Sequence, residues 1–95
     1  MAQPGQLSQA THTSAKEYAG QAYIRKADAA RLLGDMREVV DGLTEGFRIA
    51  GEIDSMQRFS EAGDVISNMP DAWKRETAVQ NLQKDISHAI VVARQ

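Results

Sequence analysis

Tyr18–Phe47, which reads YAGQAYIRKADAARLLGDMREVVDGLTEGF, is the stretch of sequence that decides the fold. Its apolar residues recur every three to four positions, the spacing at which side chains share one face of an α-helix. They are Tyr18, Ala22, Ala29, Leu33, Met36, Val40, Leu43 and Phe47. The pattern predicts an amphipathic helix whose apolar face packs against other helices.

Gly34 lies inside this stretch and raises the question of whether it forms one helix or two. Glycine is favoured just beyond a helix end, and Asp35 with Glu38 has the spacing of a capping box that would start a second helix. The apolar face nevertheless crosses Gly34 without a change of phase. We therefore predict one continuous helix over residues 15–52, with a break at Gly34 as the alternative.

The residues before this helix are polar. Residues 1–13 are rich in Gln, Ser and Thr and carry little apolar surface to offset the entropy of ordering them. Ser14 and Glu17 then have the spacing of a capping box, which would start a helix at Ser14. We expect a flexible polar tail over residues 1–13 and a single helical domain over residues 14–95.

Two more helices are expected after residue 53. The first is short and could be capped by Asp54, and the second begins near Pro70, a residue that suits the first turn of a helix. Their apolar faces are Met56, Phe59, Ala62, Val65, Ile66 and Met69, then Ala72, Val79, Leu82, Ile86, Ala89, Ile90 and Ala93. The predicted fold is an all-α, elongated antiparallel bundle in which the two later helices pack along the long one.

Composition limits the class of protein. A chain of 95 residues supports one modest core, and the absence of cysteine excludes disulfides, thiolate nucleophiles and cysteine metal sites. The start of the chain has no signal-peptide pattern, and the longest apolar run, Ala89–Ala93, is far below the roughly 20 residues that span a bilayer. We expect a cytoplasmic protein with no membrane association.

No catalytic constellation is visible in the sequence. A nucleophile needs a base and a base needs an orienting group, and no such set is apparent. His12 and His88 are too few for a zinc site, which needs three or four ligands. We expect no enzymatic activity, no cofactor and no bound metal.

The middle of the chain is acidic. Residues 35–69 carry eight acidic and three basic residues, a net charge of −5, whereas the whole chain has a net charge of −2. Asp41, Glu45 and Glu52 fall on one side of the predicted helix, either as a solvated face or as a surface that docks on a basic partner. Trp73 and Tyr23 are the aromatic candidates for the same contact, although each could instead cover the edge of the core.

Gly42, Gly46 and Ala50 form a row of small residues beside the apolar face. Such a row allows two helices to approach closely. The close contact could lie within one chain or across the axis of a homodimer.

The segment Ala29–Gly34 (AARLLG), followed by Val40, resembles the first helix and turn of helix-turn-helix DNA-binding proteins. That resemblance implies a DNA-binding regulator. The segment departs from the family pattern at Asp35, where an apolar residue is expected, and the would-be recognition helix offers Glu38, Asp41 and Glu45 to a polyanion.

These features favour a non-enzymatic adaptor or inhibitor that binds a larger protein with a basic surface. Occupying a nucleic-acid-binding groove in this way is a role often filled by small phage-encoded inhibitors of host machinery. A helix-turn-helix regulator is the alternative.

Overall fold

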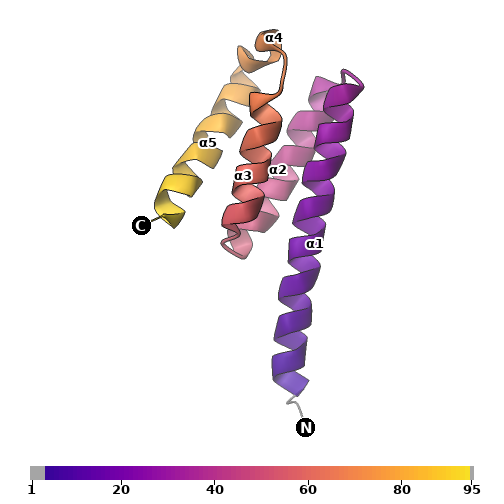
Figure 1. Ribbon diagram of the computed structural model, residues 1–95, viewed down its shortest axis with the longest axis vertical. Helices are drawn as coiled ribbons and strands as arrows, with labels where there is room; N and C mark the ends of the chain where they lie inside the picture. The colour runs from indigo at the N-terminus through magenta and orange to yellow at the C-terminus, as the bar shows by residue number, and fades with distance from the viewer. Residues whose placement is uncertain (1–3, 95) are drawn as a thin grey trace.

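The computed structural model describes residues 4–94, with side chains from residue 15 onward. The helices are α1 (Pro4–Leu32), α2 (Met36–Glu52), α3 (Met56–Ser67), α4 (Asp71–Lys74) and α5 (Thr77–Ala93), and these residues contain no strand. The four longer helices alternate in direction along the long axis of the molecule (Figure 1), which measures 55 × 31 × 15 Å. The predicted all-α, elongated antiparallel bundle is confirmed.

Gly34 ends α1, so the prediction of a continuous helix is wrong and the alternative is right. The glycine has a φ of 79°, and the backbone N–H groups of Gly34 and Asp35 donate to the carbonyls of Arg31 and Ala30. This is the Schellman motif, in which a left-handed residue closes the last turn of a helix. Asp35 then caps α2 by accepting a hydrogen bond from the N–H of Glu38 at 3.2 Å.

The turn folds α2 back along α1. Lys16 pairs with Glu52 at one end of the two helices, and Gly42 lies against Ala27 farther along. Residues before Lys16 therefore extend past the last residue of α2 (Figure 1).

The helix start expected at Ser14 is also wrong, because α1 begins at Pro4. Residues 1–3 lie outside the described residues. The division into a flexible tail (1–13) and a domain (14–95) stays a prediction.

The apolar face predicted for residues 18–33 is on the solvent side of α1. Tyr18 and Leu33 are 76% and 85% exposed, and Ala22 and Ala29 are exposed as well. The buried face of α1 consists instead of Gly20, Ile24, Ala27 and Ala30. Because the turn at Gly34 lets α1 and α2 orient independently, the apolar spacing that continues across Gly34 does not indicate which face of α1 is buried.

The prediction for α2 is confirmed. Leu43 is fully buried, Val40 and Phe47 are half-buried and packed on the core, and Met36 is half-buried. The core that these residues join is formed by Ile24, Ala27, Ala30, Val39, Leu43, Ala62, Val65, Ile66, Met69, Val79, Leu82 and Ile86.

The connection from α2 to α3 also contains one residue in the left-handed region, here an aspartate and not a glycine. Asp54 takes the left-handed position with a φ of 50°, and the N–H of Ser55 donates to Ala50 at 3.0 Å. Ser55, rather than the predicted Asp54, caps α3 by accepting from the N–H of Arg58.

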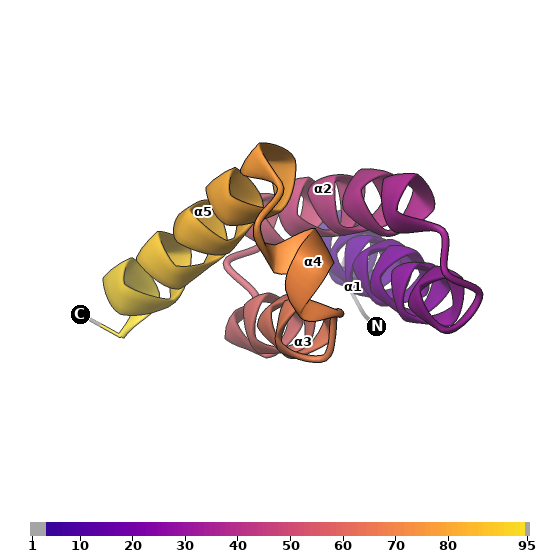
Figure 2. The same cartoon turned by 90° about the horizontal axis from the view of Figure 1, so that it is seen from above.

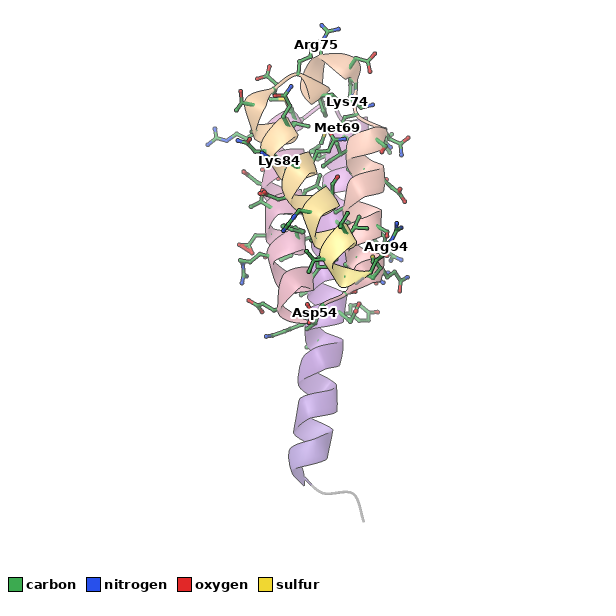
Figure 3. The ribbon with its side chains drawn as sticks, turned by 90° about the vertical axis from the view of Figure 1, so that its left-hand side faces the viewer. Asp54, Met69, Lys74, Arg75, Lys84 and Arg94 are labelled. Carbon is green, nitrogen blue, oxygen red and sulfur yellow. The ribbon has the colours of Figure 1, made fainter. Side chains whose placement is uncertain are left out.

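The last predicted helix is interrupted. α4 begins at Asp71 as expected, but Arg75 and Glu76 separate it from α5. Seen from above, α4 covers the end of the bundle where α3 and α5 meet (Figure 2). Met69, which joins α3 to α4, is buried at this end of the core, whereas the neighbouring Lys74 and Arg75 lie at its outer edge (Figure 3).

Candidate functional site

Three carboxylates form an acidic edge along the side of α2 that adjoins α1. Glu38, Asp41 and Glu45 occupy positions i, i+3 and i+7, which share one helix face. Together with Gly42 of α2 and with Tyr23 and Lys26 of α1, they line a shallow groove of about 140 Å³. The antiparallel turn at Gly34 thus brings an aromatic ring, 39% exposed, beside the acidic edge.

The carboxylates of α2 differ in how far their charge is compensated. Glu45 pairs with Arg48 at 3.0 Å, and Glu52 pairs with Arg48 at 2.7 Å and with Lys16 at 3.0 Å. Lys16 and then Arg48 lower the pKa of Glu52, while Glu45 above all raises the pKa of Arg48. Among the described side chains, Glu38 and Asp41 have no basic group within ion-pair distance.

The predicted contact residues therefore separate into two groups. Asp41, Glu45 and Tyr23 are brought together at one groove, whereas Glu52 lies at the far end of α2 and is held by Lys16. Trp73 is on α4, half-buried against the core, and does not line this groove. Its position agrees with the alternative interpretation of a residue that covers the helix junction.

The row of small residues forms the close crossing of α2 with α1. A Cβ atom on Gly46 would lie 2.8 Å from Ile24 Cγ1, and one on Gly42 would lie 3.1 Å from Ala27 Cβ. Ala50 is fully buried. In this arrangement the row packs inside one chain, as the first of the two alternatives predicted.

Arg58 is a buried charge that the sequence analysis did not single out. Its side chain is 7% exposed, with Nη1 2.9 Å from Glu61 and Nε 3.2 Å from Glu17, although Nε itself makes no hydrogen bond. With its amide oxygen turned toward the guanidinium group, Gln21 accepts a further bond from Nη1 at 3.2 Å. No local pattern could identify this cluster, because α1 and α3 meet only in the folded chain.

Another cavity lies between α1 and α3 and is lined by Arg25, Asp28, Glu61, Asp64 and Asn68 among others. An apolar cavity of about 370 Å³ lies between α2, the start of α3 and the end of α5, and it includes Phe47, Phe59 and Val92. His88 also lines this cavity. Within the described part of the chain, no three His, Cys, Asp or Glu side chains are placed to share a metal ion. None of the helices in residues 4–94 combines the length and the apolar composition of a bilayer crossing.

The helix pair that resembles a helix-turn-helix has a different geometry from that motif. The helices of a helix-turn-helix cross at about 90–120°, whereas α1 and α2 lie antiparallel along the whole of α2 (Figure 1). The side of α2 next to α1 carries the acidic edge.

Comparisons with models of protein families, with curated proteins and with solved structures give no match for this chain.

Proposed function

We propose that this protein is a non-enzymatic binding module. It binds a basic surface of a larger protein through the groove between α1 and α2. The observation that carries the proposal is the position of Tyr23 beside the acidic edge. Tyrosine is enriched among the residues that dominate binding energy, and surrounding charges select a partner of opposite sign. The nearby Lys26 offers one donor to a partner carboxylate or carbonyl.

The two unpaired carboxylates supply the attraction. Glu38 and Asp41 are free of intramolecular ion pairs with the described residues, so a partner's Lys or Arg can reach them without breaking an existing contact. Glu45 would exchange its exposed pair with Arg48 for a pair with the partner, at little net cost because surface ion pairs contribute about 0–1 kcal/mol. Charges at the rim mainly raise the association rate and make binding sensitive to salt.

Proteins that bind nucleic acids present basic grooves of the kind this surface would fit. An inhibitor that occupies such a groove, as small phage-encoded inhibitors of host machinery do, is the specific role we propose. The alternative, a helix-turn-helix regulator, would need phosphate contacts from a helix that instead presents carboxylates.

A basic helical peptide made of Lys, Arg and Leu is a suitable probe of the groove. Its affinity is measured by fluorescence anisotropy at low and high salt for the native protein, for Asp41→Lys and for Asp85→Lys. Asp85 is exposed on α5, so the two variants change the net charge equally at different places. We expect Asp41→Lys to weaken binding about tenfold or more and Asp85→Lys to have a much smaller effect.

Equal losses in the two variants would contradict the proposal, because they would mean that the peptide senses only net charge. Tyr23→Ala adds a second check, since an aromatic anchor contributes to affinity even at high salt. A duplex DNA titration separates the alternative, because a regulator would bind DNA with a steep dependence on salt.

A further inference from the structure

The outer face of α1 is apolar and uncovered. Tyr18, Ala22 and Ala29 of α1, with Leu33 directly after its last residue, are here called the outer stripe. All four are exposed to solvent, Tyr18 by 76% and Leu33 by 85%. The acidic residues of this part of α1, Glu17 and Asp28, are on other sides of the helix. A row of exposed apolar side chains on one helix face marks a surface that another molecule covers.

The spacing of the outer stripe is the same in both directions along the helix. Its members are separated by four, seven and four positions, so the stripe is symmetric about the midpoint between Arg25 and Lys26. A two-fold axis beside the stripe, level with that midpoint and perpendicular to the helix, would place a second α1 antiparallel to the first. Tyr18 would then face Leu33 of the partner subunit, and Ala22 would face Ala29 of the partner subunit, as the reciprocal contacts of a two-fold interface require.

The sizes of these residues suit such a pairing. The alanines would lie nearest the axis, where small side chains let two helices approach closely, and each tyrosine would pack on a leucine at the ends. The stripe extends for about 23 Å along the helix at 1.5 Å per residue. This is a small interface, so the contact should depend on protein concentration.

The two cations near the midpoint are drawn away from the stripe. Arg25 lines a cavity on the side of α1 that faces α3, and its Nη2 donates to Gln21 at 2.9 Å when the amide oxygen of Gln21 is turned toward it. Lys26 lines the groove with the acidic edge of α2. Neither charge has to be buried for two outer stripes to meet.

The acidic edge also provides charge complementarity across the axis. Gly42 is level with Ala27, so Asp41 and Glu45 lie at the height of the midpoint of the stripe. In the antiparallel pair, Lys26 of each chain comes level with these carboxylates of the other. Attraction between them offsets the repulsion between the two lysines.

From this symmetry we propose that the outer stripe binds a second copy of the chain, with the two α1 helices antiparallel about the midpoint between Arg25 and Lys26. This inference does not rest on the proposed function, because its apolar contacts come from the outer stripe; the two proposals share only Lys26, Asp41 and Glu45 at the edge of the groove. The contact proposed for a homodimer is thus the outer stripe and not the row of Gly42, Gly46 and Ala50, which packs within the chain.

Sedimentation equilibrium of the full chain tests self-association, from about 10 μM to about 1 mM, where small interfaces associate. The native protein should approach twice the monomer mass, and Tyr18→Glu or Leu33→Lys should each weaken the dimer about tenfold or more. The double variant should recover most of the loss, because each new glutamate would face a new lysine. Val91→Glu, at an exposed apolar position on α5, is the control and should not change the mass.

A native protein that stays monomeric throughout this range overturns the proposal. A dimer that forms but is not restored in the double variant overturns the register, because a parallel pair would bring like charges together. Far-UV circular dichroism of each variant checks that these exposed substitutions leave the fold intact.

The absence of native cysteine permits a second test of the register. Chains carrying Ala22→Cys, mixed with chains carrying Ala29→Cys, should form a disulfide-linked heterodimer under mild oxidation, since these positions would face each other. Ala22→Cys alone should cross-link poorly, because its two copies would be about 10 Å apart along the axis. Equal yields for the mixture and for either single variant contradict the pairing.

Discussion

Single glycines determine how closely the helices approach. At Gly46 the backbone of α2 lies so near α1 that an added methyl group would meet Ile24 Cγ1 at 2.8 Å and the carbonyl oxygen of Gly20 at 3.3 Å. The contact is with the inner part of a buried side chain and with backbone, and neither can move freely. Gly51, one turn and a half later on the same helix, has open space around it.

Gly46→Ala should therefore destabilise the protein although alanine is the better helix former. Overpacking costs about 1–3 kcal/mol and the propensity gain returns about 1 kcal/mol, so we expect a net loss of about 1–2 kcal/mol in the free energy of unfolding. Urea denaturation followed by circular dichroism measures it. The matched variant Gly51→Ala should gain up to about 1 kcal/mol, and equal effects at the two positions would argue against the close crossing.

At the scale of elements, the turns decide the arrangement. The Schellman motif at Gly34 and the equivalent turn at Asp54 each place one residue in the left-handed region, and each is followed by a polar cap, Asp35 or Ser55. The first turn makes α1 and α2 a hairpin, and that hairpin places Tyr23 beside the acidic edge. The candidate site is thus a consequence of one glycine.

Gly34→Ala distinguishes a hairpin from a continuous helix. In a continuous helix the substitution would stabilise the protein by about 1 kcal/mol. In the left-handed position it should instead cost about 1 kcal/mol, or about 4–8 °C in the melting temperature of a domain of this size. Gly34→Asn should lose less, because asparagine tolerates the left-handed region better than alanine does. An increase in melting temperature for Gly34→Ala would contradict the turn.

The sequence predicted the elements better than their arrangement. Periodicity identified the all-α class, the core face of α2 and the short helix α3, because those signals are local. It assigned α1 the wrong face, since the outer stripe has the spacing of a core face and the buried face has one large apolar residue, Ile24, among Gly20 and two alanines, which carry little hydrophobic signal. Choosing between two faces of one helix requires knowing what packs on it.

The candidate site, like the fold, could be predicted from the sequence only where its residues lie on one helix. The carboxylates on α2 share a face by spacing alone, so Asp41 and Glu45 could be grouped from the sequence. Their proximity to Tyr23, and the pairing of Glu52 with Lys16, depend on the antiparallel register of α1 and α2. The buried Arg58 depends on a third helix as well.

At the scale of the whole molecule, a buried charge ties α3 to the hairpin. Arg58 extends from α3 to α1, where Glu17 and Gln21 surround its guanidinium group, and Glu61 holds it from the same helix. Both carboxylates remain partly exposed to water. The arginine is therefore the buried member of a cluster whose other members are solvated, and its loss would leave no buried anion without a partner.

Arg58→Met tests how much this cluster contributes to holding the helices together. Methionine keeps most of the apolar stem but removes the charge, and we expect a loss of about 1–2 kcal/mol, below the 3–5 kcal/mol of a fully buried pair because Glu17 and Glu61 stay hydrated. Urea denaturation of Arg58→Met, Glu17→Gln and the double variant gives the coupling between the two side chains, expected at about 1 kcal/mol. If the coupling is near zero and the free energy of unfolding is unchanged, apolar packing alone fixes α3 on α1. The 3.2 Å approach of Glu17 to Arg58 would then contribute nothing to the arrangement.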